Sequence, residues 1–185
     1  MIAYHGTTVG GLHTLKPMEN PQRGESRVNV WIRQWEPGDA GYVAYMHGRY
    51  YWERHGFHPA AEYYFIKYLA DFVRDPEGGM LWIAEADGNT VGSAAIVRVD
   101  DSTAQFRWFM VKESHRRMGV GGRLIDAALD FCRNNGYRSV FLWTFRGLDP
   151  ARRLYEKAGF ALTEEKPNHE WSCVEITEQK MELSL

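Results

Sequence analysis

Two arginines and three glycines lie close together in the segment Arg116-Arg117-Met118-Gly119-Val120-Gly121-Gly122. This segment follows an apolar run, 106–111, and precedes a run with helical periodicity, 123–134, so we expect it to join a strand to a helix. The first turn of a helix presents unpaired N–H groups and about half a positive charge, which suit phosphate oxygens. Arginines add charge-assisted donors. The segment therefore predicts a phosphate-binding turn, with a tight turn without a ligand as the alternative.

Two other glycine-rich phosphate loops fit this segment poorly. A Walker loop needs Lys-Ser or Lys-Thr after its last glycine, whereas Gly122 is followed by Arg123 and Leu124. The dinucleotide-binding fingerprint needs three glycines at another spacing and an early first strand. Both classes of nucleotide site are therefore disfavoured.

The elements that would hold this turn follow from hydrophobic periodicity and turn residues. Asp39 is the expected N-cap of the first helix, and His58-Pro59 opens the second. A helix between two neighbouring strands implies a parallel pair, so we predict a mixed sheet. The predicted strands are 28–34, 81–86, 90–99, 104–111, 139–144, 160–165 and 173–183, and the predicted helices are 39–55, 58–74, 123–134 and 149–157.

Composition is that of an ordinary folded protein, with 185 residues, 44% of them hydrophobic and 14% aromatic. We expect a poorly ordered or extended leader over 1–27 and a single domain over 28–185. The net charge of -2 argues against nucleic-acid binding over the whole surface. No apolar run reaches ~20 residues, so we expect no membrane segment and a soluble, cytoplasmic protein. Cys132 and Cys173 are expected to be buried, reduced thiols.

Two segments resemble the Gcn5-related N-acetyltransferase (GNAT) superfamily. They are Phe109-Met110-Val111 followed by Arg116-x-x-Gly119-x-Gly121, and Ala151-x-x-Leu154-Tyr155-Glu156-Lys157-x-Gly159-Phe160. The likeness covers roughly 28–183. Within the superfamily the chain looks most like the acetyltransferase half of bacterial fusions with a MarR-type regulator, because of the aromatic stretch 42–72 and the run 142–144. The segment before residue 28 is too short for a winged helix, so we expect no direct binding to nucleic acid.

The resemblance implies an α/β (α+β) fold with a mixed, mostly antiparallel central sheet flanked by helices. Strands 104–111 and 139–144 would splay apart. The pantetheine arm of acetyl-CoA, as co-substrate, would lie in the gap and bond to the backbone like an added strand. Its pyrophosphate would sit on the N–H groups of 117–122. The implied coenzyme-binding residues are Phe109, Met110, Val111, Arg116, Arg117, Met118, Gly119, Val120, Gly121, Gly122 and Arg152.

Acetyl transfer to an amine needs a neutral nucleophile and a protonated leaving thiolate. An alkyl ammonium has a pKa of about 10.4, so a base or water chain must remove its proton. Tyr155 matches the superfamily's general acid; the alternative is a packed tyrosine. Glu85 is a candidate base, with Glu53 and His55 as others, and each could instead be a solvated or structural residue. Leu148 replaces an asparagine that the superfamily often has, which removes one polar contact to the coenzyme.

Aromatic residues gather in the first two predicted helices, where they could form a cage for an amine or simply belong to the core. His47, His55 and His58 fit no compact ligand spacing, so no metal is expected. The aromatic residues are Tyr42, Tyr45, Tyr50, Tyr51, Trp52, Phe57, Tyr63 and Tyr64.

The resemblance thus predicts an acetyl-CoA-dependent N-acetyltransferase that acts on a primary amine by direct transfer in a ternary complex. The acceptor amine is left open between a small molecule, an amino acid and a protein amine. Assembly as a homodimer is also left open. The rival prediction is a non-catalytic acyl-CoA-binding regulatory module, which would keep the phosphate-binding turn and lose the general acid.

Overall fold

The computed structural model describes residues 29–185 as one sheet with helices on both faces. The leader predicted over 1–27 lies outside the described residues. The described elements, in chain order, are β1 (Val30–Gln34), α1 (Asp39–His55), α2 (Pro59–Arg74), β2 (Met80–Ala86), β3 (Asn89–Arg98), β4 (Thr103–Val111), the short 3-10 helix η1 (Glu113–His115), α3 (Val120–Asn134), β5 (Ser139–Phe145), α4 (Asp149–Lys157), β6 (Ala161–Asn168) and β7 (Ile176–Ser184).

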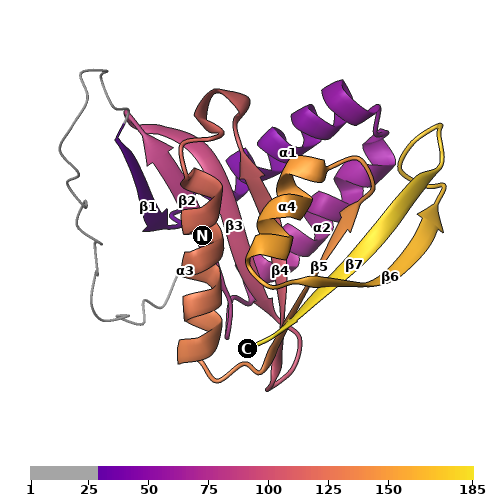
Figure 1. The fold of residues 1–185 in the computed structure, drawn as a ribbon. Helices are drawn as coiled ribbons and strands as arrows, with labels where there is room; N and C mark the ends of the chain where they lie inside the picture. The colour runs from indigo at the N-terminus through magenta and orange to yellow at the C-terminus, as the bar shows by residue number, and fades with distance from the viewer. Residues whose placement is uncertain (1–28) are drawn as a thin grey trace.

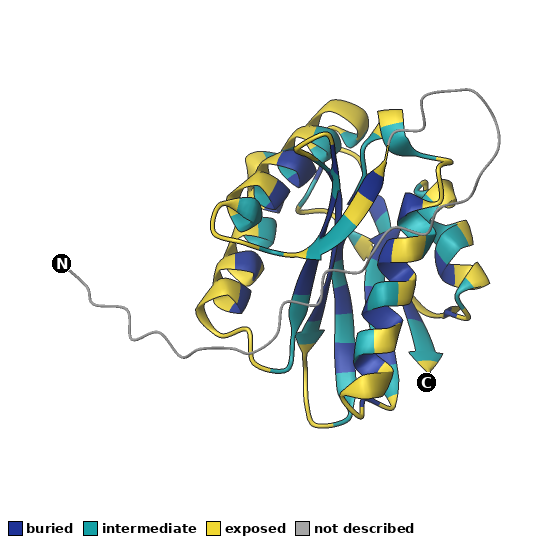
Figure 2. Cartoon of the chain, turned by 90° about the vertical axis from the view of Figure 1, so that its left-hand side faces the viewer, coloured by how far each residue is buried: buried dark blue, intermediate teal, exposed yellow. Residues whose placement is uncertain are grey.

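The seven-stranded sheet has the order β1-β2-β3-β4-β5-β7-β6. Every neighbouring pair is antiparallel except β4 and β5, which are parallel. Helices α1 and α2 cover one face of the sheet, and α3 and α4 cover the other (Figures 1 and 2). The predicted fold class, a mixed and mostly antiparallel sheet flanked by helices, is confirmed.

The central strand β3 shows how the two helical layers complete the core. Its residues 91–96 are all buried, without the alternation expected of a half-exposed strand, because helices cover both sides. Ala94 and Ile96 pack in one cluster with Leu124 of α3, whereas Ala95 packs in another with Leu69 of α2. The sheet therefore lies between two apolar layers, one on each face.

Most predicted boundaries are displaced by one to three residues, and predictions at Asp39, at the start of α3 and at Cys173 are corrected as follows. Helix α1 has Gly38 at its N-cap rather than Asp39, whose carboxylate is instead held by Arg33 Nη1 at 2.6 Å. Helix α3 begins at Val120, three residues earlier than predicted, because low helix propensity at the glycines is outweighed by packing. Cys173 lies between β6 and β7 and is exposed, so its prediction as a buried strand residue is wrong.

Among the residues described, no helix is long and apolar enough to cross a bilayer.

Candidate active site

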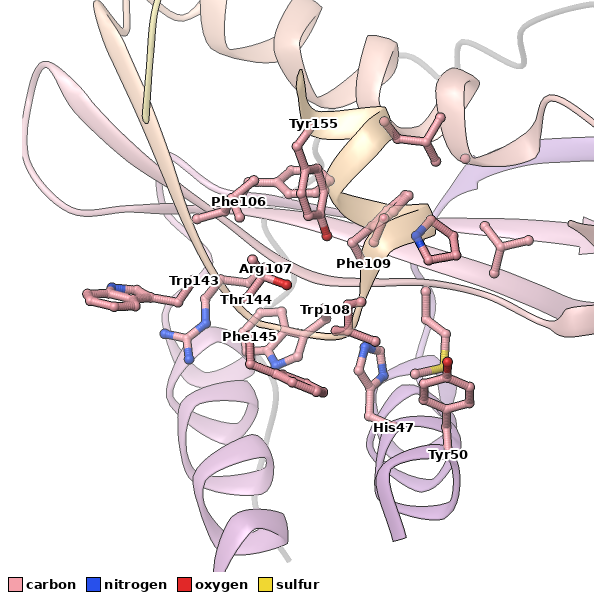
Figure 3. Close-up of a pocket in the computed structure, with 18 of the residues that line it drawn as sticks. His47, Tyr50, Phe106, Arg107, Trp108, Phe109, Trp143, Thr144, Phe145 and Tyr155 are labelled. Carbon is pink, nitrogen blue, oxygen red and sulfur yellow. The ribbon is translucent and has the colours of Figure 1, made fainter. Parts of the chain in front are cut away.

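Strands β4 and β5 begin as a parallel pair and then separate. Three consecutive residue pairs, starting at Thr103 and Ser139, join them. Beyond these pairs β4 runs on to Val111 and β5 to Phe145, while β5 pairs along its length with β7. A cavity of about 730 Å³ lies between the separated ends (Figure 3). The expected splaying of these strands is confirmed, and it leaves backbone groups of β4 free to bond to a ligand.

A β-bulge shapes the edge of β4 that faces this cavity. Trp108 and Phe109 together stand opposite a single position of β3. Trp108 has a φ of 46°, and its carbonyl accepts a hydrogen bond from Ser93 Oγ at 2.7 Å. Trp108 packs with the α2-side cluster, whereas Phe109 packs on the side of α3 and α4. The extra residue therefore redirects the side chains that follow it.

The glycine-containing turn meets the cavity at the start of α3. Arg117 and Gly119 have positive φ values of 64° and 79°, and no side chain caps the helix at Gly119. The N–H groups of the first helical turn are thus available to an anion. At Gly121 a Cβ atom would come within 2.9 Å of Leu154 Cδ1 and 3.2 Å of Phe109 Cζ. A larger residue there would therefore have to displace the side chains of Leu154 and Phe109.

The predicted coenzyme residues divide into those that line the cavity and those that support the turn. Phe109, Met110, Val111, Arg116, Arg117 and Gly121 line it. The other predicted residues of the turn do not line the cavity, namely Met118, Gly119, Val120 and Gly122. Val120 is buried in the core, and Met118 is exposed. The turn therefore offers the cavity two arginines and the helix terminus.

Arg116 also braces the turn. Its Nε donates to the carbonyl of Val111 at 2.9 Å, and its guanidinium carbon lies 5.2 Å from the ring centroid of Tyr50. Its Nη1 is 3.8 Å from Glu113 Oε1. This side chain ties the end of β4 to α1.

Tyr155 points its hydroxyl into the cavity from α4 (Figure 3). Its ring is buried beside Phe106 and Phe109, with centroid separations of 6.1 and 5.6 Å. Burial, and to a smaller extent the nearby Tyr51, raises the pKa of Tyr155. The hydroxyl therefore stays protonated at neutral pH and can donate a proton or a hydrogen bond.

His47 and Thr144 were not predicted to belong to the site, yet both line the cavity. The Nδ1 of His47 lies 2.9 Å from the carbonyl oxygen of Val43, which it reaches as a donor, so its Nε2 carries the lone pair. His47 Nε2 and Thr144 Oγ1 are buried polar atoms without a hydrogen-bond partner among the described residues. Burial lowers the pKa of His47 to about 4, so the ring is neutral at pH 7. Unpartnered buried polar atoms are uncommon in folded proteins, and these two belong to residues that line one cavity.

The predicted bases lie elsewhere. Glu85 is on β2, which β3 and β4 separate from the gap. Its carboxylate accepts a hydrogen bond from Arg33 Nε at 2.8 Å. Glu53 is exposed and forms an ion pair with Arg49. His55 is packed edge-on against Phe145 and does not line the cavity. The structure therefore does not bring Glu85 to the cavity, because β3 and β4 lie between β2 and the gap. Arg33 of β1 pairs with the Glu85 carboxylate instead.

Arg152 is likewise not brought to the cavity. It is half-buried on α4, where its Nε donates to Glu156 Oε1 at 2.8 Å. The next residue, Arg153, lines the cavity instead. A rotation of about 100° per residue separates the two side chains on the helix.

The aromatic cluster predicted on α1 and α2 is divided between cavity and surface. Tyr51 stacks on Phe57 and on Phe65, each at 5.2 Å, and all three line the cavity. Tyr50 also lines it. The exposed members, which make no lining contact, are Tyr42, Tyr45, Trp52 and Tyr63.

No group of three or more His, Cys, Asp or Glu side chains that could hold a metal is found in the described part of the chain.

The mixed sheet with separated strands β4 and β5, and the glycine turn before α3, match the fold that the resemblance implies. Comparison with known proteins identifies the family. The chain belongs to the acetyltransferase (GNAT) family, whose sequence model matches residues 44–160. Human N-acetyltransferase 8B is 32% identical over 100 residues, which cover 51% of this chain and 44% of that protein. The chain thus spans less than half the length of this relative.

Solved structures share the fold. Ard1 from Thermoplasma volcanium has a TM-score of 0.65 at 27% identity, with 84% of this chain and 97% of that chain covered. The yncA structure from Salmonella typhimurium, solved with its cofactor acetyl-CoA, has a TM-score of 0.63 at 19% identity and covers 84% and 94% of the two chains.

Proposed function

We propose that this chain is an N-acetyltransferase that moves an acetyl group from acetyl-CoA to a primary amine, by direct attack of the amine in a ternary complex. The observation that carries the proposal is the cavity between β4 and β5, where the turn before α3 and the hydroxyl of Tyr155 face one space. Membership of the GNAT family supports the same reaction.

The donor would bind along the α3 side of the gap. Its pyrophosphate would accept hydrogen bonds from the N–H groups of 117–122, with the side chain of Arg117 as a charged donor. Its pantetheine arm would extend along the unpaired edge of β4 near residues 109–111. The Val111 carbonyl already accepts a bond from Arg116, so we assign the contacts to the other backbone groups of this segment. Arg153, rather than Arg152, would lie beside the donor.

Tyr155 is assigned as the general acid. Attack of the amine nitrogen on the thioester carbon forms the amide bond and breaks the carbon–sulfur bond, so the sulfur gains a proton and the nitrogen loses one. The protonated hydroxyl of Tyr155 can stabilise the departing sulfur by a hydrogen bond and supply its proton. Water then restores the proton on the tyrosine.

His47 is assigned as the group that orients the amine. No Asp or Glu among residues 29–185 lines the cavity, so the acceptor nitrogen has no carboxylate base there. Since the pKa of His47 is about 4, its ring is too weak a base to hold a proton taken from an alkyl ammonium. The amine would lose that proton to water as it binds, and Nε2 of His47 would accept a hydrogen bond from the neutral nitrogen.

Several finer features remain proposals. We propose that the protein acts in the cytoplasm, as a single domain from residue 28, on a small-molecule or protein amine. A homodimer is the assembly to test first by light scattering. The likeness to the acetyltransferase half of MarR-type fusions stays a prediction.

Release of coenzyme A thiol, measured with a panel of amines and peptides, tests the proposed reaction. The expected result is release above the rate without acceptor for at least one amine. The rival function, a non-catalytic acyl-CoA-binding module, predicts that acetyl-CoA binds while no acceptor stimulates release. That outcome would contradict the proposed enzyme.

A further inference from the structure

The cavity wall carries positive charge without matching negative charge. Five basic side chains line it, namely Arg107, Arg116, Arg117, Arg153 and Lys157, whereas no acidic side chain of the described residues does. Such a wall disfavours a second cation, so a simple ammonium ion is a poor ligand for it. It favours ligands that bring negative charge with them.

Four of these basic residues lie on the donor side. Arg116 and Arg117 belong to the turn before α3, and Arg153 and Lys157 belong to α4, which covers the same face of the sheet as α3 (Figure 2). The phosphate groups of acetyl-CoA account for their charge under the proposed function. They leave Arg107 without an assigned ligand.

Arg107 faces the opposite side of the sheet. Its guanidinium carbon lies 4.3 Å from the ring centroid of Tyr68 on α2 and 5.3 Å from that of Trp108. Ordinary strand alternation sets Arg107 on the α2 side, opposite to Phe106. The bulge that follows adds Trp108 to the same side before Phe109 faces α3 and α4. Arg107 therefore borders the part of the cavity that the donor does not need.

The charge of Arg107 has no counter-charge in the described part of the chain. Its one polar contact there is a hydrogen bond from Nη1 to Gln105 Oε1 at 3.2 Å. Burial lowers the pKa of Arg107, and no carboxylate opposes that effect. By contrast, Arg33 is held by two carboxylates. A half-buried cation between aromatic rings is stabilised when an anion pairs with it.

We propose that Arg107 binds a carboxylate group of the acceptor, and therefore that the substrate is a small amine which also carries a carboxylate, as an amino acid does. This inference rests on the proposed acetyltransferase function and names its substrate class. The planar guanidinium binds both oxygens of a carboxylate through parallel hydrogen bonds, and the aromatic surroundings strengthen that pairing by excluding water. The amine of the same molecule reaches His47 and the acetyl group, and an apolar side chain fits the wall of Phe57, Phe65 and Phe145.

A matched set of acceptors tests this assignment. Phenylalanine, phenylalaninamide and phenethylamine share an aromatic side chain and a primary amine, but phenylalanine alone has a carboxylate. For the wild-type protein we expect kcat/KM at least about 10-fold higher with phenylalanine, because a hydrogen bond to a charged group is lost in the other two. The kcat/KM values are expressed per concentration of the neutral amine, so differences between the acceptors in the pKa of the ammonium group do not affect the comparison.

The variant Arg107→Gln separates binding of the carboxylate from a structural role. We expect it to lower kcat/KM for phenylalanine by about 10–100-fold, mainly through KM, and to leave phenethylamine turnover and the Kd of acetyl-CoA within about 2-fold. Retained phenethylamine turnover also shows that the variant is folded. Arg107→Lys, which keeps the charge and loses the planar fork, should recover part of the phenylalanine activity. Arg133→Gln, at an exposed ion pair on α3, is the control and should change neither acceptor.

The outcomes distinguish the inference from the function it rests on. Equal kcat/KM for phenylalanine and phenethylamine in the wild type, or an equal loss with both acceptors in Arg107→Gln, overturns the carboxylate site alone. A preference for phenylalaninamide over phenylalanine does the same and favours a peptide N-terminus. Binding of acetyl-CoA without turnover of any amine overturns the proposed acetyltransferase, and the inference with it.

Discussion

The substitution Tyr155→Phe removes one oxygen atom from the cavity and keeps the packing of the ring. The ring lies between Phe106 and Phe109, and phenylalanine preserves these contacts. The hydroxyl points into the cavity, so its loss leaves no unpaired group in the core. We therefore expect the free energy of unfolding to change by less than about 0.5 kcal/mol.

The expected loss in catalysis is much larger than this change in stability. A positioned general acid contributes about 10²–10⁴-fold to the rate. We expect kcat to fall by about 10²-fold or more, which corresponds to about 2.7 kcal/mol in the activation free energy, while the Kd of acetyl-CoA stays within about 2-fold. Because burial raises the pKa of Tyr155, ionisation of its hydroxyl should not limit the wild-type rate below about pH 10.

The assay is coenzyme A thiol release at saturating acetyl-CoA and amine, with thermal unfolding measured in parallel. Tyr137→Phe is the matched control, since the Tyr137 hydroxyl donates to the Gly78 carbonyl at 2.5 Å, outside the cavity. The control should lose about 1 kcal/mol of stability and keep its kcat. An unchanged kcat in Tyr155→Phe would refute the general-acid assignment and leave Tyr155 as a packed tyrosine.

Three further predictions follow from the described contacts. Gly122→Glu should weaken acetyl-CoA binding by about 10-fold or more and Gly122→Gln by much less, because a Cβ there meets nothing within 4 Å and the added charge opposes phosphate; equal affinities by calorimetry would contradict the phosphate site. The pKa of His47 falls from 6.5 in the unfolded chain to about 4, so the unfolded state binds more protons between these values, and stability should drop by on the order of 3 kcal/mol as pH falls through this window. Urea unfolding of wild type and His47→Phe measures this, and an identical pH slope would count against it. A thiol reagent should modify Cys173 rapidly and Cys132 after unfolding, since Cys132 is buried with a pKa raised to about 12; two fast thiols would disagree with the fold.

The order and type of the elements could be predicted because hydrophobic periodicity and turn chemistry are local properties. The asparagine–glycine and aspartate–glycine turns and the proline at the start of α2 lie where the sequence placed them. The start of α3 was placed too late, because Gly121 packs against Leu154, a residue 33 positions later along the chain. Tertiary packing overrides local helix propensity there.

The turn proposed to bind the donor could be predicted from the sequence, because it is one continuous segment whose residue types and spacing are visible there. Arg153 and Lys157 of α4 line the cavity from a distant segment and were not predicted. The acceptor side depends on strand order, which sets Glu85 beside Arg33, and on the bulge in β4, which sets Trp108 on the α2 side with Arg107. The place of His47 in the cavity could not be predicted from the sequence, which shows only a histidine among aromatic residues of a helix. The lack of a partner for its Nε2 is a property of the folded core.

Transfer of a labelled acetyl group is the most direct test of the central claim. The protein is incubated with acetyl-CoA that carries the label in its acetyl group and with phenethylamine and phenylalanine, and the products are measured by mass spectrometry. The account predicts labelled N-acetylated product formed in step with free coenzyme A, and a loss of both in Tyr155→Phe. Acetyl-CoA that binds, as shown by a thermal shift, but yields no acetylated amine above the protein-free reaction would contradict it.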